Sequence, residues 1–232
     1  MLVLALDTAT SAVTAGLLRL PAVGSPEVLA ERVTVNARAH GELLMPSVCS
    51  VLATVGVSMR DLDAVVCGIG PGPFTGLRVG MVTAAALGDA LGLPVYPVCS
   101  LDAIAQRAGT GSPLMVITDA RRREVYWARY DECGARVDGP HVDRPLDVAL
   151  AGVSRVAGAA DLLGADVLGL DVLGLDVRGL LVVAPRYPDS AGLVAVVAAA
   201  VRARATPGPL QPLYLRRPDA WEPGPRKRVT PV

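Results

Sequence analysis

A glycine-rich segment between a short apolar run and a helical stretch is the part of the sequence most suited to ligand chemistry. It reads Gly68-Ile-Gly-Pro-Gly-Pro-Phe-Thr-Gly-Leu-Arg-Val-Gly80. A glycine-rich turn from a strand into a helix can hold a phosphate group, because the first N–H groups of the helix lack partners within it. The spacing does not fit a dinucleotide fingerprint, since the third glycine of G-x-G-x-x-G would fall on Pro73 or Thr75.

Lysine and proline usage weighs against other phosphate-binding loops. A Walker A loop needs a lysine, and the only lysine of the chain is Lys227. Pro71 and Pro73 also have no N–H to donate to a phosphate. We therefore favour a rigid turn that directs the next helix, and we keep Gly70 and Gly72 as weak candidates for cofactor binding.

The elements that must position this turn are a strand and a long helix. Residues 64–67 are apolar and rich in β-branched side chains, which favours a buried strand. Residues 75–91 are apolar nearly all round, and Arg78 and Asp89 within them exclude a membrane span. Phe74 is expected to be an apolar plug that pins the turn to the helix. A helix without a polar face must be covered on two sides, so we predict a partner interface on the side away from its sheet.

The predicted interface combines this helix with the preceding one, over residues 40–55. That helix has a core stripe and, beside it, a second apolar stripe. An apolar patch formed by both helices would be costly to leave in water. The predicted interface residues are Met45, Cys49, Ala53, Arg78, Val82, Ala85 and Asp89.

Five segments spread over nearly the whole chain resemble the bacterial TsaB (YeaZ) family. They are VLALDTATSAVTAGL, ARAHGELLMP, GIGPGPFTGLRVG, TDARRREVYWARY and PLYLRRPDAW. The resemblance implies an α/β, actin-like ATPase fold with two ribonuclease-H-like lobes, each a mixed sheet flanked by helices. It also implies the role of a dimerisation subunit in the machinery that builds threonylcarbamoyladenosine beside the anticodon of tRNA.

The same resemblance implies protein partners. These are the catalytic threonylcarbamoyl transferase subunit (TsaD-like) and the associated small ATPase (TsaE-like), with tRNA contacted only through the complex. Alone, the chain would pair with itself through a two-fold axis. The resemblance leads us to expect no cofactor and no membrane contact.

Two departures from the enzymes of this fold favour a non-catalytic scaffold. The catalytic relatives carry two metal-binding histidines four residues apart in the helix at 40–55, whereas here His40 is followed by Leu44. Actin-like ATPases also place an acidic residue and a phosphate-binding glycine in the first turn, and this chain keeps only Asp7. We expect His40 to be a cap or a surface group, no catalytic or metal-binding residue, and Asp7 as a weak cofactor candidate. The alternative is an actin-like enzyme active on its own: a kinase, a nucleotide-dependent carbamoyl or acyl transferase, or a peptidase.

Composition sets the broad class. The 232 residues are 52% hydrophobic, which supports a substantial core, and the 22 basic and 22 acidic residues cancel, so no overall field would draw the chain onto nucleic acid. The four cysteines lack the spacing of a zinc site or a disulfide framework. The N-terminus has no basic segment and its apolar run stops at Asp7, unlike a signal peptide, so we expect a cytoplasmic protein.

The linker at residues 109–113 predicts a division into an N-terminal lobe, 1–110, and a smaller C-terminal lobe, 111–232. Residues 163–177 hold three copies of a five-residue unit, which we interpret as a repeat expansion in a tolerant connection. In the C-terminal lobe we expect strands at 114–118, 124–130, 135–137 and 180–183, and a helix near 190–204.

Two basic runs stand out in this second half. Arg121-Arg122-Arg123 lies in an expected turn, where it either contacts RNA phosphates or forms a solvated loop, and the second reading is the commoner one. The proline-rich tail ends in Arg226-Lys227-Arg228, and residues 212–216 within it are expected to lie extended across the body.

Overall fold

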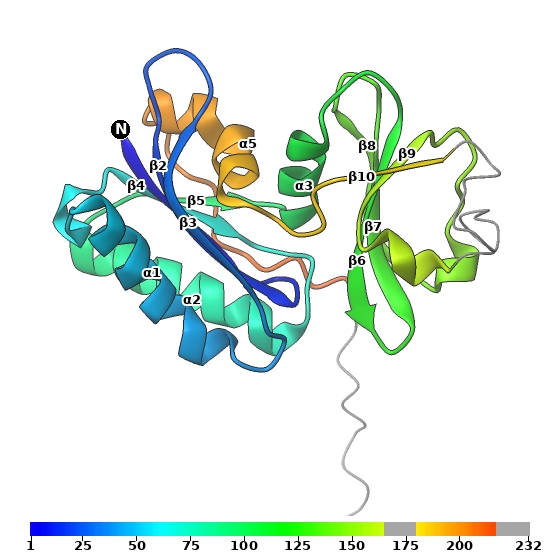
Figure 1. The fold of residues 1–232 in the computed structure, drawn as a ribbon, viewed down its shortest axis with the longest axis horizontal. Helices are drawn as coiled ribbons and strands as arrows, with labels where there is room; N and C mark the ends of the chain where they lie inside the picture. The colour runs from blue at the N-terminus through cyan, green and yellow to red at the C-terminus, as the bar shows by residue number, and fades with distance from the viewer. Residues whose placement is uncertain (165–179, 217–232) are drawn as a thin grey trace, which may run out of the picture.

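The computed structural model describes residues 1–164 and 180–216. Within them the chain forms two five-stranded sheets beside each other (Figure 1). The first, in the order β3-β2-β1-β4-β5, consists of β1 (Leu2–Asp7), β2 (Ala12–Arg19), β3 (Glu27–Val35), β4 (Ala64–Gly68) and β5 (Val95–Val98). The second, in the order β10-β9-β6-β7-β8, consists of β6 (Leu114–Arg121), β7 (Glu124–Tyr130), β8 (Arg136–Asp143), β9 (Arg155–Gly158) and β10 (Leu181–Val183).

The two sheets share one topology. In each, the first three strands form an antiparallel meander, and the remaining two add in parallel on the other side of the first strand. The predicted α/β fold of two mixed-sheet lobes is therefore confirmed.

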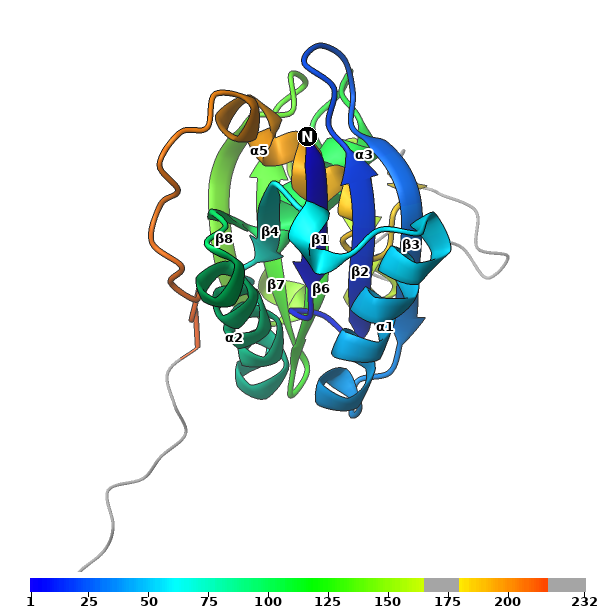
Figure 2. The same ribbon diagram turned by 90° about the vertical axis from the view of Figure 1, so that its left-hand side faces the viewer.

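Helices cover both faces of the first sheet (Figure 2). They are α1 (His40–Val55) and α2 (Phe74–Leu91) on one face and α5 (Ser190–Arg202) on the other. The remaining helix, α3 (Ser100–Ala108), packs against α5 and the second sheet. Three short 3-10 helices lie between the other elements: η1 (Met59–Asp61), η2 (Pro145–Asp147) and η3 (Ala160–Leu163). The helices α1 and α2 each end at a glycine in the left-handed conformation, Gly56 and Gly92, which lets the cap N–H return to the last turn. None of the helices in the two described ranges is long and apolar enough to cross a membrane.

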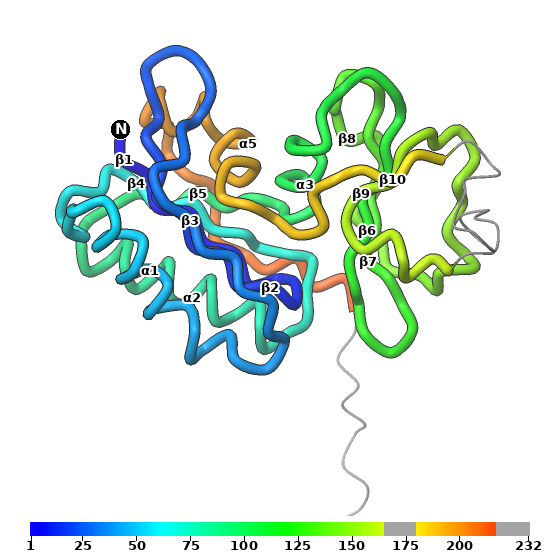
Figure 3. Tube along the Cα trace, in the orientation of Figure 1, coloured from blue at the N-terminus to red at the C-terminus, as the bar shows by residue number. Residues whose placement is uncertain are grey.

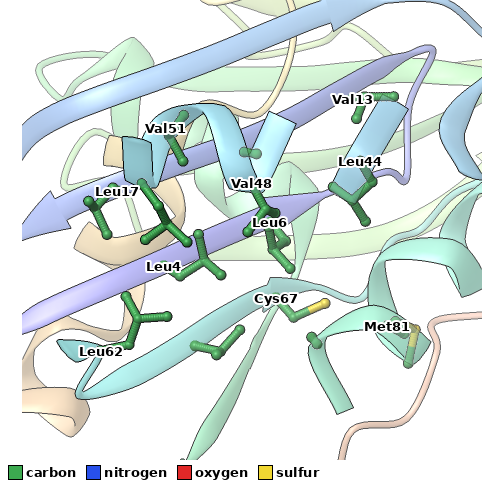
Figure 4. Packing of buried hydrophobic residues seen from close by; sticks show 14 of the residues in the cluster. Leu4, Leu6, Val13, Leu17, Leu44, Val48, Val51, Leu62, Cys67 and Met81 are labelled. Carbon is green, nitrogen blue, oxygen red and sulfur yellow. The ribbon is translucent and has the colours of Figure 1, made fainter. Parts of the chain in front are cut away.

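The central strand β1 shows why helices pack on both faces of the first sheet. Its residues alternate, so that Leu4 and Leu6 pack towards α1 and α2 (Figure 4), while Val3 and Ala5 pack towards α5. In the α1 and α2 layer, buried leucines and valines from the helices meet those of β1 and β2. Each of these two helices therefore commits one face to the core.

The last helix of each half packs against the other half. Although α5 belongs to the C-terminal half of the sequence, its Leu193 and Val194 join the core of the first sheet. Conversely, Leu101 and Ile104 of α3 pack with Leu114 and other residues of the second sheet. The predicted boundary at residue 110 falls between the strands of the first sheet and those of the second, but the helices pack across it. A division of the chain into two separate lobes at this residue stays a prediction.

The second half also differs from expectation in its strands. β6 and β8 run several residues further than predicted, and β9 was not predicted. The strand β9 is only four residues long and is held in the sheet by β6 on one side and β10 on the other. Most of the five-residue repeat and all of Arg226-Lys227-Arg228 lie outside the described residues.

The C-terminal segment crosses the body, as predicted (Figure 3). The backbone N–H of Leu213 donates to the carbonyl of Ile69, with 2.9 Å between N and O. The Arg216 guanidinium then pairs with Glu124 of the second sheet at 2.7 Å. This segment therefore links the loop before α2 to the β6–β7 pair.

Candidate functional site

The exposed side of α2 is the first half of the candidate interface. Arg78, Val82, Ala85 and Asp89 are all exposed, while Leu77 and other residues one turn apart on the opposite side are buried. Val82 has 66% of its surface exposed. Around it the surface forms a shallow depression of about 470 Å³, lined by Phe74, Thr75, Arg78, Val79, Val82 and Thr83.

The neighbouring helix α1 supplies the second half. Cys49 and Ala53 are exposed, and Met45 is half-buried because it also packs against the core. The helices contact each other and run side by side (Figure 1). The structure therefore places all seven predicted interface residues at or near the open surface of this helical layer. Small side chains at Cys49, Ala53 and Ala85 keep that surface low.

The ring of Phe74 is not the expected plug. It is 53% exposed and stacks on Tyr214, with 5.3 Å between ring centroids. The guanidinium of Arg78 lies 3.6 Å above the Phe74 ring, and its Nε donates to the Tyr214 hydroxyl at 2.7 Å. Leu77 fills the space below the turn instead, beside Gly70. The C-terminal segment thus frames one edge of the α2 face, a contact that no local sequence pattern indicated.

The first turn, after β1, holds α2 in place. The Thr8 hydroxyl donates to the carbonyl of Gly76 at 2.7 Å and accepts from the N–H of Gly80 at 2.8 Å. A Cβ on Gly80 would lie 2.5 Å from the same hydroxyl oxygen. Because Gly80 has no side chain, α2 can pack closely against the first turn.

The two cofactor candidates in the glycine-rich turn are buried. Gly70 has a positive φ of 93°, and its carbonyl accepts from the N–H of Ser100 at 2.7 Å. A Cβ on Gly72 would lie 2.2 Å from the carbonyl oxygen of Ala9. Backbone from the first turn thus occupies the place where a phosphate would approach Gly72. The geometry favours a structural turn.

Asp7 is enclosed as well. It is 1% exposed, accepts from the N–H of Ala9 at 2.9 Å, and accepts from the hydroxyl of Ser100 at 2.5 Å. Burial raises the pKa of Asp7 to about 6, although the hydrogen bonds from Ser100 and Ala9 act to lower it. A Cβ on Gly68 would lie 1.8 Å from the Asp7 carboxylate, so the strand β4 needs glycine there. The carboxylate is thus surrounded by protein groups.

His40 is buried rather than a cap or a surface group. It is 8% exposed, and its Nε2 lies 2.8 Å from the carbonyl oxygen of Thr10. Since a carbonyl can only accept, Nε2 carries the proton and donates. The ring therefore ties the first residue of α1 to the first turn. In the two described ranges, no group of three or more His, Cys, Asp or Glu side chains is placed to hold a metal ion.

A small hollow lies between the lobes. Its volume is about 70 Å³, whereas pockets for small ligands typically measure roughly 300–1,000 Å³. It is lined by Thr10, Ser11, Thr118, Asp119, Ala159, Leu162, Arg186 and Tyr187. A nucleotide would not fit this hollow as it stands.

The raised pKa of Asp7 gives a testable pH dependence. The carboxyl binds its proton more tightly in the folded protein than in the unfolded chain, so its contribution to stability is largest below about pH 4 and is lost as pH rises through about 6. Asn at this position cannot ionise and keeps the shape. We expect Asp7→Asn to gain roughly 3 kcal/mol of unfolding free energy relative to wild type between pH 4 and pH 7. Denaturant melts at several pH values measure this, and a difference that does not change with pH would contradict it.

Comparison with known proteins assigns the chain to a family. The family model for TsaD, tRNA N6-adenosine threonylcarbamoyltransferase, matches residues 27–159, more than half of the chain. An uncharacterized protein of Mycobacterium tuberculosis is 53% identical over 218 residues, which cover 94% of this chain and 93% of the relative. The solved structure of YeaZ from Pseudomonas aeruginosa superposes with a TM-score of 0.71 at 29% identity, covering 92% of this chain and 99% of that one. The Escherichia coli tRNA threonylcarbamoyladenosine biosynthesis protein TsaB is 36% identical over 139 residues, 58% of each protein. The chain belongs to the TsaB (YeaZ) family.

The range matched by the TsaD model contains both helices of the candidate interface. The matched range begins at the first residue of β3 and runs through α1 and α2 into the second sheet. The helices of the candidate interface therefore lie in a region that is shared with the transferase family.

Proposed function

We propose that this protein is a scaffold subunit that binds the catalytic threonylcarbamoyl transferase subunit and supports the formation of threonylcarbamoyladenosine in tRNA. The observation that carries the proposal is the open α1 and α2 face in a chain related to the transferase family. Two related folds can pair through equivalent helices about an approximate two-fold axis. The exposed Val82 and Ala85 suit such a contact because burying them removes apolar surface from water.

Three enclosed groups support a non-catalytic role. Asp7 is held by Ser100 and Ala9, Gly72 is covered by the first turn, and His40 donates to a backbone carbonyl. A catalytic residue must reach its substrate, and none of these three is open to one. The proposal therefore assigns them to the frame that holds α1 and α2.

The proposal extends to the rest of the assembly. We assign a TsaE-like small ATPase as a further partner, contact with the tRNA substrate within the complex, and a cytoplasmic location. In the absence of the catalytic subunit, the same face is proposed to pair two copies of this chain. In such a dimer the same surface of each copy would face the other across a two-fold axis, which closes the assembly at two subunits.

Reconstitution tests the proposed function. The protein and its TsaD-like partner are purified separately, mixed, and analysed by size exclusion and by assay of tRNA modification with ATP and the small ATPase. We expect co-elution and modification only when both subunits are present. Equal modification by the partner alone would contradict the scaffold role. ATP hydrolysis by this protein alone, lost in Asp7→Ala, would instead support the alternative of an independent enzyme.

A further inference from the structure

The exposed face of α2 carries two opposite charges, one towards each end. Arg78 is the fifth residue of the 18-residue helix, and Asp89 lies in its last turn. Both side chains are exposed, and neither forms an ion pair with any residue of the two described ranges. Val82 and Ala85 lie between them, also exposed. The face is therefore an apolar strip with a positive charge at one end and a negative charge at the other.

Asp89 is placed unfavourably for the helix itself. The C-terminal end of a helix carries partial negative charge, so basic residues stabilise the last turn and acidic ones destabilise it. The last turn of α2 has no basic residue, and Asp89 stands there instead. The carboxylate thus costs the isolated helix stability, and no described residue pairs with it in return. A partner outside this molecule would account for an acidic residue at this position.

Arg78 is positioned to bind a carboxylate. Its guanidinium lies 3.6 Å from the centre of the Phe74 ring, and its Nε donates to the Tyr214 hydroxyl at 2.7 Å. These contacts leave the two terminal nitrogens without an acceptor among the described residues. A guanidinium that is already held in place loses less conformational freedom when its remaining N–H groups bind a carboxylate.

The four residues of the face are arranged symmetrically along the helix. They are spaced i, i+4, i+7 and i+11, which places them on one side of α2. Arg78 and Asp89 are equally far in sequence from one midpoint, and Val82 and Ala85 are equally far from the same midpoint. That midpoint is one residue from the centre of the helix. A two-fold axis through it would set a second α2 antiparallel to the first, with Arg78 of each copy facing Asp89 of the other.

We propose that two copies of this chain pair through α2 in this antiparallel register, with two symmetric Arg78–Asp89 ion pairs around a centre of Val82 and Ala85. The small side chain of Ala85 allows the two helices to approach closely. Parallel helices would bring like charges together, so the charge pattern selects the antiparallel orientation. The inference rests on the part of the proposed function in which this face pairs two copies, and it names the residues that fix how they pair.

Charge reversal at either position tests the register. A dimer of Arg78→Glu would place acidic residues against acidic ones, and a dimer of Asp89→Arg would place arginines against arginines. We expect each variant alone to dimerise at least about tenfold more weakly than wild type at low salt. An equal mixture of the two variants should form a heterodimer of near wild-type affinity, because every facing pair again has opposite charges. Analytical ultracentrifugation, with one variant fluorescently labelled in the mixture, measures these affinities.

The mixture also controls for folding. Arg78→Glu gives up the contacts with Phe74 and Tyr214, but only a folded variant can restore dimerisation when it is mixed with Asp89→Arg. The second variant places a basic residue in the last turn of α2, so its melting temperature should equal or exceed that of wild type. As a matched control, Glu132→Arg reverses an exposed acidic residue in the turn between β7 and β8 of the second sheet. It should dimerise like wild type.

The outcomes separate this inference from the proposed function. A wild-type protein that stays monomeric at about 1 mM, single variants that dimerise like wild type, or a mixture that does not recover would each overturn the register. Variants that dimerise normally but bind the catalytic subunit more weakly would assign the two charges to that contact, which also overturns it. If the wild-type protein fails to bind the catalytic subunit but shows the charge-dependent dimer, the scaffold role is wrong and the register is supported.

Discussion

Glutamate in place of Val82 is expected to abolish binding to the catalytic subunit while leaving the protein folded. Val82 is 66% exposed on α2, so the new carboxylate is solvated in the isolated protein. In the complex it would be buried without a partner, a penalty of about 4 kcal/mol or roughly a thousandfold in affinity. Glutamate also favours helix more than valine does, so stability should not fall. Calorimetric titration with the TsaD-like subunit measures the affinity, and circular dichroism melts report the fold.

A matched control uses the same substitution on another surface. Val23 is 87% exposed in the connection between β2 and β3. Val23→Glu should therefore bind the catalytic subunit with wild-type affinity. Wild-type binding by Val82→Glu would place the interface elsewhere, and a large drop in its melting temperature would mean that Val82 is more tightly packed than its exposure indicates.

Alanine at Gly72 is expected to destabilise the whole protein. The added Cβ would lie 2.2 Å from the carbonyl oxygen of Ala9 and 2.8 Å from its carbonyl carbon. These are backbone atoms of a buried turn, which cannot rotate away as a side chain can. Overpacking of this kind costs about 1–3 kcal/mol and occasionally more, and a backbone clash belongs at the upper end. We expect the melting temperature to drop by about 10 °C.

Gly41 provides the control for that substitution. It lies in the first turn of α1, and a Cβ built on it meets nothing within 4 Å. Gly41→Ala should match or exceed the stability of wild type, since alanine is the better helix former. If Gly72→Ala melted like Gly41→Ala, the glycine-rich turn would be able to move, and a ligand-binding role for it would regain support.

Local patterns predicted β4, α1 and α2 of the first lobe well, because periodicity depends only on neighbouring residues. The bounds of α1 agree with the prediction, and those of α2 differ by one residue. The alternation in β1 reflects burial on both faces. The candidate interface was predicted by the same reasoning. A helix that is apolar on most of its surface can pack only one side against its sheet, so the apolar residues on its other side stay at the protein surface.

Features that depend on distant residues escaped sequence reasoning. Phe74 was expected below the turn, but its contact is Tyr214, 140 residues further along the chain. His40 was expected to be a cap or a surface group, yet it reaches a carbonyl of the first turn. The role of Thr8 likewise depends on α2 being brought to it by β4. No spacing rule within one segment contains this information.

The exchange of helices between the two halves has a consequence for the unity of the molecule. Because α5 completes the core of the first sheet and α3 contributes to that of the second, each half lacks part of its interior without the other. Contact between α3 and α5 is close enough that a Cβ on Gly192 would lie 2.3 Å from the carbonyl oxygen of Ala103. The lobes are thus interlocked. A partner that binds α1 and α2 would therefore contact one cooperative body, in which the two halves unfold together.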